Sequence, residues 1–232
     1  MTPSPINGPR IEPRSGAARK LVVILHGYGA DGADLIGLGH EWADFLPDTA
    51  FAAPDGHEAC GQNPFGRQWF ALSQRDPHEL WSGACAAAPV IDAFLDSELK
   101  ARGLTDSDLA LVGFSQGAMM ALHVGLRRKR APAAILSYSG ALVGPQHLAQ
   151  AIGGRAPEDL PAMLLIHGTE DAVIPVDALY ASADAIAAAG GVCEYKASPG
   201  VGHSVDGEGL AHGAVFLARS LGLPVPGKLT AS

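Results

Sequence analysis

Short apolar runs at regular intervals divide this chain into strands and helices. Runs of this kind are typical of strands buried on both faces of a sheet. The clearest lie at residues 20–25, 109–112, 133–138 and 163–166. Residues 49–53 and 192–197, the latter with only partial alternation of apolar and polar positions, are predicted to be two further strands.

Between the strands, apolar residues recur at spacings of three and four, which is typical of helices. The longest such segment covers residues 80–101, where Pro89 either kinks the helix or resets its start. Further helices are predicted from about residue 34, from residue 118, and over 176–189 and 207–221. Strands that alternate with helices favour parallel pairing, so we expect an α/β fold with a mostly parallel central sheet flanked by helices on both faces.

Length and composition are those of one globular unit. A chain of 232 residues with 47% hydrophobic and 17% charged residues buries a sizeable core and commonly stays undivided. We expect a loose N-terminal arm over residues 1–19, a single domain over 20–222 and a C-terminal tail over 223–232. The basic run at 127–130 is interpreted as a solvent-exposed helix end favoured by the helix dipole.

Charge and cysteine content exclude several classes of protein. A net charge of -8 argues against a nucleic-acid partner. The chain starts without the apolar segment of a signal peptide, and no apolar run approaches the ~18 residues that span a bilayer, so we expect a cytoplasmic protein without stable membrane insertion. Three cysteines at unrelated spacings indicate neither a disulfide framework nor a zinc site.

A candidate nucleophile lies between the strand at 109–112 and the helix-forming residues that follow. The pentapeptide Gly-Phe-Ser-Gln-Gly at 113–117 matches G-x-S-x-G, which in a strand-to-helix context forms a tight turn that exposes the serine hydroxyl. The match alone is weak, because 29 glycines in 232 residues give roughly 0.2 matches by chance. The interpretation therefore depends on finding catalytic partners in the right order.

Such partners follow the next two predicted strands. The strand at 163–166 runs into a segment with Glu170 and Asp171, and the strand at 192–197 runs into a segment with His203. Catalytic groups collect outside the carboxyl ends of parallel strands, and the order serine, acid, histidine is that of the α/β-hydrolase arrangement. We therefore expect Ser115 as nucleophile, His203 as general acid and base, and one of the two carboxylates to orient the imidazole.

The other histidines near these segments fit structural roles better. His212 falls inside the last predicted helix. His26 and His167 stand beside glycine after strands, and we interpret both as loop-structuring residues. The Gly-rich loop at 26–32 is expected to supply one backbone N–H of an oxyanion hole, because it follows a buried strand.

Four segments in order carry a resemblance to a known family. They read Leu-His-Gly-Tyr-Gly-Ala-Asp at 25–31, Gly-Phe-Ser-Gln-Gly at 113–117, His-Gly-Thr-Glu-Asp-Ala-Val-Ile-Pro at 167–175, and Gly-His at 202–203. Over about residues 20–221 the chain resembles the phospholipase/carboxylesterase family of α/β-hydrolases, which includes the acyl-protein thioesterases. The resemblance implies that Asp171 is the triad acid and that the backbone N–H groups of Tyr28 and Gln116 form the oxyanion hole.

The segment at 54–77 is expected to form a wall of the substrate pocket, because long ordered loops usually carry function. Its Arg-Gln-Trp-Phe-Ala stretch at 67–71 resembles the pocket-lining segment of the family and departs from it at Ala71. Tyr28 also departs, since many relatives carry leucine there. The candidate substrate contacts are Phe65, Trp69, Phe70, Tyr138 and Val173.

The sequence thus predicts a serine carboxylesterase that hydrolyses short- to medium-chain carboxylic esters through an acyl-enzyme, with a small-molecule substrate and without a metal or organic cofactor. An acyl-protein thioesterase or a lysophospholipase uses the same machinery and is the alternative. A binding protein that kept the fold and lost catalysis is the alternative from a different class. The resemblance also makes a homodimer possible.

Overall fold

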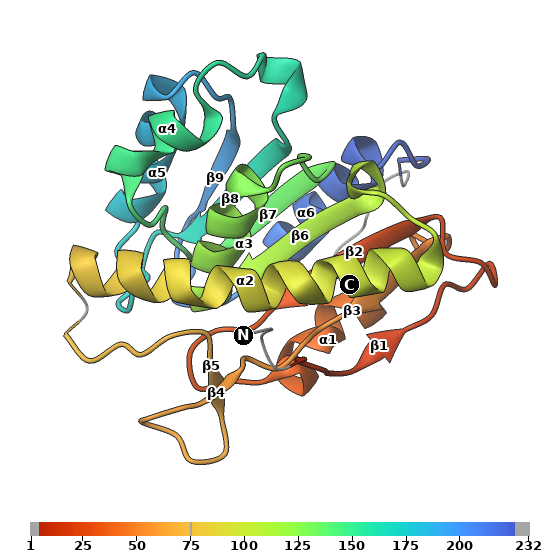
Figure 1. Cartoon of the computed structure of the whole chain (residues 1–232), viewed down its shortest axis with the longest axis horizontal. Coiled ribbons are helices and arrows are strands. Elements are labelled where there is room, and N and C mark those ends of the chain that lie inside the picture. Colours follow the sequence, from red (N-terminus) through yellow and green to blue (C-terminus); the bar gives the residue numbers. More distant parts are fainter. Residues whose placement is uncertain (1–4, 75, 226–232) are drawn as a thin grey trace.

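A seven-stranded sheet forms the centre of the molecule (Figure 1). The computed structural model describes residues 5–74 and 76–225. The sheet has the order β1-β3-β2-β6-β7-β8-β9, and every neighbouring pair is parallel except β1 and β3. Its strands are β1 (Arg10–Ile11), β2 (Lys20–Leu25), β3 (Thr49–Ala52), β6 (Leu109–Phe114), β7 (Ala134–Tyr138), β8 (Ala162–Gly168) and β9 (Glu194–Ser198). The predicted mostly parallel α/β sheet is confirmed.

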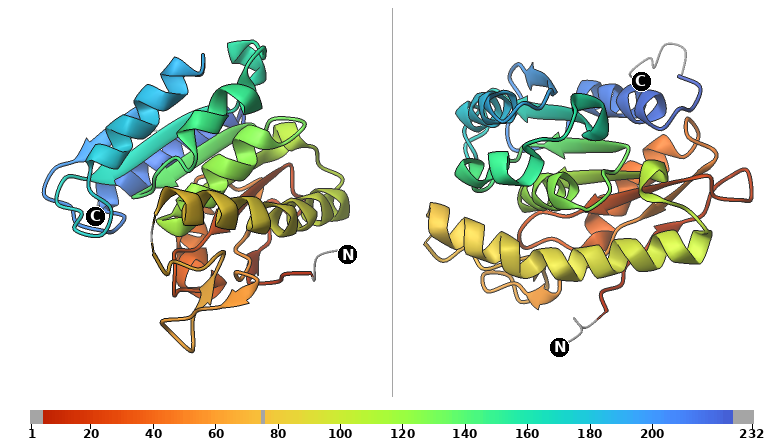
Figure 2. Two further views of the ribbon diagram at one scale, coloured as in Figure 1. Left: turned by 60° about the vertical axis from the view of Figure 1, so that its left-hand side comes forward. Right: turned by 45° about the horizontal axis from the view of Figure 1, so that its top comes forward.

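Helices cover both faces of this sheet (Figures 1 and 2). They are α1 (Gly32–Trp42), α2 (Pro77–Arg102), α3 (Gln116–Arg127), α4 (Leu148–Ile152), α5 (Asp177–Ala188) and α6 (Gly207–Ser220). Helices α2, α3, α4 and α5 enclose one apolar core, and α1 and α6 enclose the other. In β2, Val23 packs into the first core and its neighbours Val22 and Ile24 into the second, which is why the strand is apolar at consecutive positions.

Helix α2 is longer than the sequence indicated. It begins at Pro77, where the side chain of Asp76 accepts hydrogen bonds from the backbone N–H groups of His78 and Glu79. It ends at Arg102, and the next residue, Gly103, has a φ of 66° that suits a glycine cap. Pro89 lies inside the helix and does not reset its start.

Three connections contain elements that the sequence did not indicate. The segment expected as a long loop at 54–77 includes an antiparallel hairpin of β4 (Glu58–Ala59) and β5 (Arg67–Gln68). The connection after β7 contains the short helix α4 and two 3₁₀ turns, η2 (Pro145–His147) and η3 (Pro157–Asp159); a third turn, η1 (Asp106–Asp108), precedes β6. Elements of one or two turns are too short to show a hydrophobic period.

The N-terminal arm is tied to the domain at β1, contrary to the loose arm expected from the sequence. β1 pairs with β3, and Arg10 forms a 2.6 Å ion pair with Glu98 of α2. Arg102 contacts the other oxygen of the same carboxylate at 2.5 Å. Glu98 is buried, so two guanidinium groups share one shielded carboxylate. Residues 226–232 of the predicted tail lie outside the described residues.

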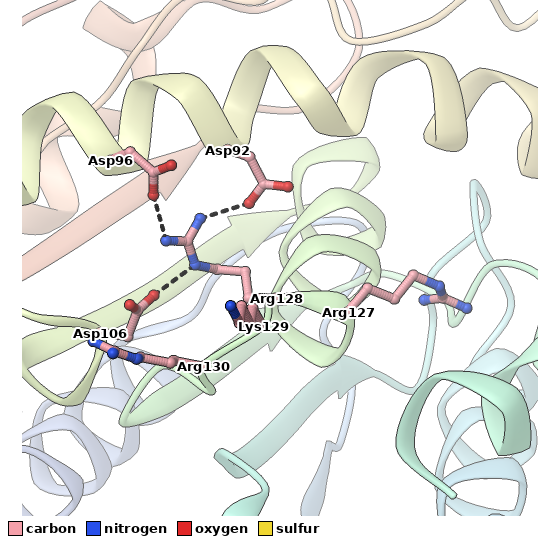
Figure 3. A pocket seen from close by; sticks show the side chains of 7 residues that line it. All are labelled: Asp92, Asp96, Asp106, Arg127, Arg128, Lys129 and Arg130. Carbon is pink, nitrogen blue, oxygen red and sulfur yellow. Dashed lines mark hydrogen bonds and ion pairs between the residues drawn. The ribbon is translucent and has the colours of Figure 1, made fainter.

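The basic run after α3 is not a uniformly solvent-exposed helix end. Arg128 has a side chain only 8% exposed, and its guanidinium contacts Asp92 and Asp96 of α2 at 2.6 Å and Asp106 at 2.7 Å (Figure 3). A planar guanidinium with five donors can serve three carboxylates at once. Only Lys129 and Arg130 extend into solvent as expected.

No helix within residues 5–74 and 76–225 combines the length and the apolar character that crossing a bilayer requires.

Replacing Glu98 by glutamine tests how strongly the arm is held. Burial alone would raise the pKa of Glu98, but Arg10 and Arg102 hold it below 4.5, its ordinary value. This stabilisation is therefore present above pH 4.5 and is lost as pH falls through the lower folded-state pKa. We expect Glu98→Gln to lower the free energy of unfolding at pH 7 by about 1–3 kcal/mol.

Urea unfolding at pH 7 and at several values from about pH 5 to pH 3 measures both effects. The variant should lose less stability on acidification than the wild type. Glu158→Gln, at an exposed position, is the control and should change neither quantity. An acid slope in Glu98→Gln equal to that of the wild type would contradict the prediction.

Candidate active site

Ser115 occupies a strained turn between β6 and α3. Its backbone angles are φ 54° and ψ −118°, a region that costs a non-glycine residue free energy. A Cβ at Gly113 would lie 2.2 Å from the carbonyl oxygen of Gly117, and a Cβ at Gly117 would lie 1.9 Å from that of Leu25. Both glycines are therefore sterically required, and the turn has the geometry of a nucleophile elbow.

The side chain of Gln116 fixes this turn from behind. It is buried, its Oε1 accepts a 3.0 Å hydrogen bond from the backbone N–H of Trp69, and its Nε2 donates to the carbonyl of Phe70 at 2.8 Å. The side chains of Trp69 and Phe70 are themselves buried, and Trp69 Nε1 donates to the carbonyl of His26 at 2.9 Å. The two aromatic residues support the elbow from the core, which corrects the expectation that they line a substrate pocket.

The Gly-rich loop after β2 lies directly against the elbow. A Cβ at Gly27 would come within 3.3 Å of Ser115 Cβ, so the backbone next to Tyr28 passes beside the serine. His26 holds this loop: Nε2 accepts a 2.8 Å bond from Gly56 N–H, so Nδ1 carries the proton and donates to the carbonyl of Gly27 at 2.7 Å. Burial lowers the pKa of His26, and the neutral ring structures the loop, as the sequence suggested.

A histidine–aspartate pair reaches the elbow from the loops that follow β8 and β9. His203 Nδ1 lies 2.7 Å from Asp171 Oδ2, and the backbone N–H groups of Val173 and Ile174 donate to Asp171 Oδ1 at 2.9 Å each. The rings of His203 and Phe114, the residue before Ser115, lie 4.8 Å apart between centroids. The geometry thus brings together residues that follow the carboxyl ends of β6, β8 and β9.

The environment of Asp171 favours its ionised form. Burial alone would raise the pKa of Asp171, but the hydrogen bonds from His203, Ile174 and Val173 hold it below its usual range. The side chain is fully shielded from solvent. Glu170, the rival carboxylate in the sequence, is exposed and does not take this position.

His167 contributes a contact that the sequence did not reveal. Its Nε2 lies 2.8 Å from the carbonyl oxygen of Ile174 and 3.2 Å from Asp171 Oδ2, so one ring N–H faces both oxygens. β8 extends through His167, and the strand therefore aims this buried ring at the loop that carries Asp171. The four-residue spacing from His167 to Asp171 was visible in the sequence, but it does not fix the direction of a side chain at a strand end.

The remaining candidates divide into buried and exposed residues. Tyr138 is 1% exposed in the core enclosed by α1 and α6, and its hydroxyl donates to the carbonyl of Gly209 at 3.0 Å. This corrects its prediction as a substrate contact, because alternation along β7 turns it away from the elbow. Phe65 and Val173 are 91% and 57% exposed. His212 lies exposed on α6, where Nδ1 contacts the carbonyl of Glu208.

Within the part of the chain that the structure describes, no group of three or more histidine, cysteine, aspartate or glutamate side chains is arranged to hold a metal ion.

Comparisons with known proteins show the family to which this chain belongs. The family model described as Phospholipase/Carboxylesterase matches residues 6–221. The chain is 26% identical to Esterase YpfH of Escherichia coli, over 83% of this chain and 79% of the relative. It is 23% identical to Acyl-protein thioesterase 1 of Gibberella zeae, over 92% and 95%.

A solved structure is more similar still. The crystal structure of esterase PE8 superposes with a TM-score of 0.87 at 41% identity and covers 94% of this chain and 100% of that one. The carboxylesterase SOBER1 of Arabidopsis thaliana, at a TM-score of 0.76 and 24% identity over 88% of this chain and 100% of its own, shares the fold. The chain therefore belongs to the phospholipase/carboxylesterase family of α/β-hydrolases, a membership that supports esterase or thioesterase activity.

Proposed function

We propose that this protein is a serine carboxylesterase that hydrolyses short- to medium-chain carboxylic esters through an acyl-enzyme. The observation that carries the proposal is the position of the His203–Asp171 pair beside the strained turn at Ser115. A serine hydroxyl is a weak nucleophile until an imidazole accepts its proton, and a buried carboxylate fixes the tautomer that can do so.

Three residues carry out the proposed reaction. His203 Nε2 accepts the proton of Ser115 as its oxygen bonds to the acyl carbon of the ester, and Asp171 stabilises the charged imidazole through Nδ1–H. The carbon–oxygen bond to the alcohol then breaks, and His203 returns the proton to the leaving oxygen. A water molecule, activated by His203 in the same way, attacks the acyl-enzyme and releases the acid and free Ser115.

Two backbone N–H groups are proposed to stabilise the tetrahedral oxyanion. The first is that of Gln116, which opens α3: the first N–H groups of a helix have no acceptor within it, and the helix dipole is positive there. The second is that of Tyr28, which the contact between Gly27 and Ser115 supports. N–H donors that already point toward the oxyanion position before the reaction lower the free energy of the charged intermediate.

The scarcity of exposed apolar side chains among the candidate substrate contacts supports the proposed preference for shorter chains. Trp69, Phe70 and Tyr138 are buried in the cores, which leaves Phe65 and Val173 as the exposed apolar candidates for contact with the substrate. Hydrolysis of a thioester or a lysophospholipid is the second candidate, and a relative named acyl-protein thioesterase 1 favours it. The cytoplasmic location and the homodimer stay predictions.

Removal of the Ser115 hydroxyl should abolish turnover. We expect Ser115→Ala to lower kcat by several orders of magnitude without loss of folding, because the triad acts as a unit. Wild-type protein should also react with a fluorophosphonate probe at Ser115, detected by mass spectrometry of the labelled peptide. If the folded wild type neither reacts with the probe nor hydrolyses esters, the protein is instead a binding protein that lacks catalytic activity.

Acyl-chain length separates the two enzymatic candidates. With p-nitrophenyl esters of increasing length, we expect kcat/KM to peak at short to medium chains and to fall for long ones, because only Phe65 and Val173 of the candidate contacts are exposed to meet additional methylene groups. Ser115→Ala provides the background rate at each length. A steady rise of kcat/KM with chain length, together with faster hydrolysis of the matched thioesters, would favour the thioesterase.

Replacement of His167 should impair chemistry more than binding. Hydrogen bonds to charged groups contribute about 1.5–3 kcal/mol, so His167→Phe should lower kcat about 10–100-fold through misplacement of Asp171, with a smaller change in KM. His167→Gln keeps an N–H donor and should retain more activity. Wild-type kcat in a folded His167→Phe variant would show that the contact with Asp171 contributes nothing to catalysis.

A further inference from the structure

A pocket lies beside the C-terminal end of α3, which is the end remote from Ser115. Its volume is about 220 Å³, and it is lined by Trp81, Arg127, His147, Gln150 and Ala151. These residues come from α2, α3, η2 and α4. α3 rises ~1.5 Å per residue, so Arg127 is roughly 17 Å from the helix start. The pocket is therefore separate from the catalytic site.

Arg127 brings an unpaired positive charge to this pocket. Among residues 5–74 and 76–225, no carboxylate lies within ion-pair distance of its guanidinium. Nη1 donates to the carbonyl of His123 at 3.2 Å, while Nη2 is buried without any hydrogen-bond partner. Burial of this cation lowers the pKa of Arg127, as expected of a charge without a counterion.

The next residue, Arg128, differs from Arg127 in that its guanidinium does have carboxylate partners. Arg128 contacts three aspartates, and Figure 3 shows Arg127 extending away from all of them. A partly buried charge without a counterion costs free energy, and an anion bound beside the guanidinium of Arg127 would offset part of that cost.

An aromatic wall stands beside this charge. The rings of Trp81 and His147 stack with centroids 4.0 Å apart, and Arg127 Cζ lies 5.1 Å from the centroid of the Trp81 ring. Gly144 fixes the indole: it has φ +62°, and a Cβ there would lie 2.1 Å from Trp81 Cε3. The wall is therefore ordered before any ligand arrives, which reduces the entropy cost of binding.

His123 adds no competing charge to the pocket. Its ring contacts Trp81 edge-on at 5.3 Å, and burial together with Arg127 lowers the pKa of His123 to about 4. At neutral pH this imidazole is uncharged. Among the five lining residues Arg127 carries the one permanent charge.

We propose that this pocket binds a small aromatic carboxylate. The ring of the ligand packs against the Trp81–His147 wall, its carboxylate pairs with Arg127, and the amide of Gln150 borders the entrance. One cation beside a flat apolar wall matches a planar monoanion, whereas inorganic phosphate would need several more donors than the lining residues offer. The proposal does not depend on the esterase activity.

Binding of benzoate to the full-length protein tests this assignment. Isothermal titration calorimetry gives the affinity, and tryptophan fluorescence gives a local signal, because Trp42 and Trp69 are fully buried while Trp81 lines the pocket. We expect saturable binding of benzoate and at least tenfold weaker binding of the uncharged analogue benzyl alcohol. Arg127→Gln should weaken benzoate binding at least tenfold, and Trp81→Phe should remove the fluorescence change.

Arg130→Gln is the matched control, since it removes an exposed cation of the same basic run, and it should bind benzoate as the wild type does. His147→Ala tests the wall without changing the arginine and should weaken binding of benzoate as well. Three results would overturn the proposal: no saturable binding, equal affinity in the wild type and in folded Arg127→Gln and His147→Ala variants, or inorganic phosphate binding as tightly as benzoate. Benzoate affinity that depends on Ser115 but not on Arg127 would place the ligand in the catalytic site and overturn it too.

Discussion

The close approach of the start of α3 to the end of β2 is the constraint on which the site depends. A side chain at position 117 would collide with the carbonyl of Leu25, so only glycine allows the helix to begin there. This turn also holds Ser115 at a positive φ, a conformation that costs a non-glycine residue about 1–3 kcal/mol of conformational free energy. Buried strand β6, the almost wholly buried helix α3 and the two hydrogen bonds of Gln116 over-determine this conformation and keep it.

The charge of the buried Asp171 depends on the hydrogen-bond donors that are buried with it. Asp171 receives hydrogen bonds at both oxygens, from His203 on one and from two backbone N–H groups on the other, with His167 close by. These donors more than offset the cost of burying the carboxylate and keep it ionised. An ionised, immobile carboxylate fixes the imidazole beside the elbow, which is the condition for proton transfer in the proposed reaction.

Helix α3 connects two different environments. Its first turn faces the elbow, and its last residues place Arg127 and Arg128 on opposite sides of the helix end. Arg128 joins α2 to the end of α3 through three carboxylates, which is a structural use of charge. Arg127 has aromatic neighbours and no counterion among the described residues, which is the basis for a ligand site there. Two adjacent residues of the same type thus have separate roles.

The sequence by itself determined the order of the longer strands and helices and predicted the elbow and the candidate base, because these depend on local apolar patterns and on short motifs at strand ends; the choice of Asp171 over Glu170 came from the family resemblance. Only the tertiary structure decided which way the side chains at those ends point. Tyr138 and Trp69 looked like pocket residues and are core residues, because the phase of a strand and the packing of a loop are set by distant elements. Contacts such as His167 with Asp171, or Arg128 with three aspartates, likewise depend on distances in space that no local pattern encodes.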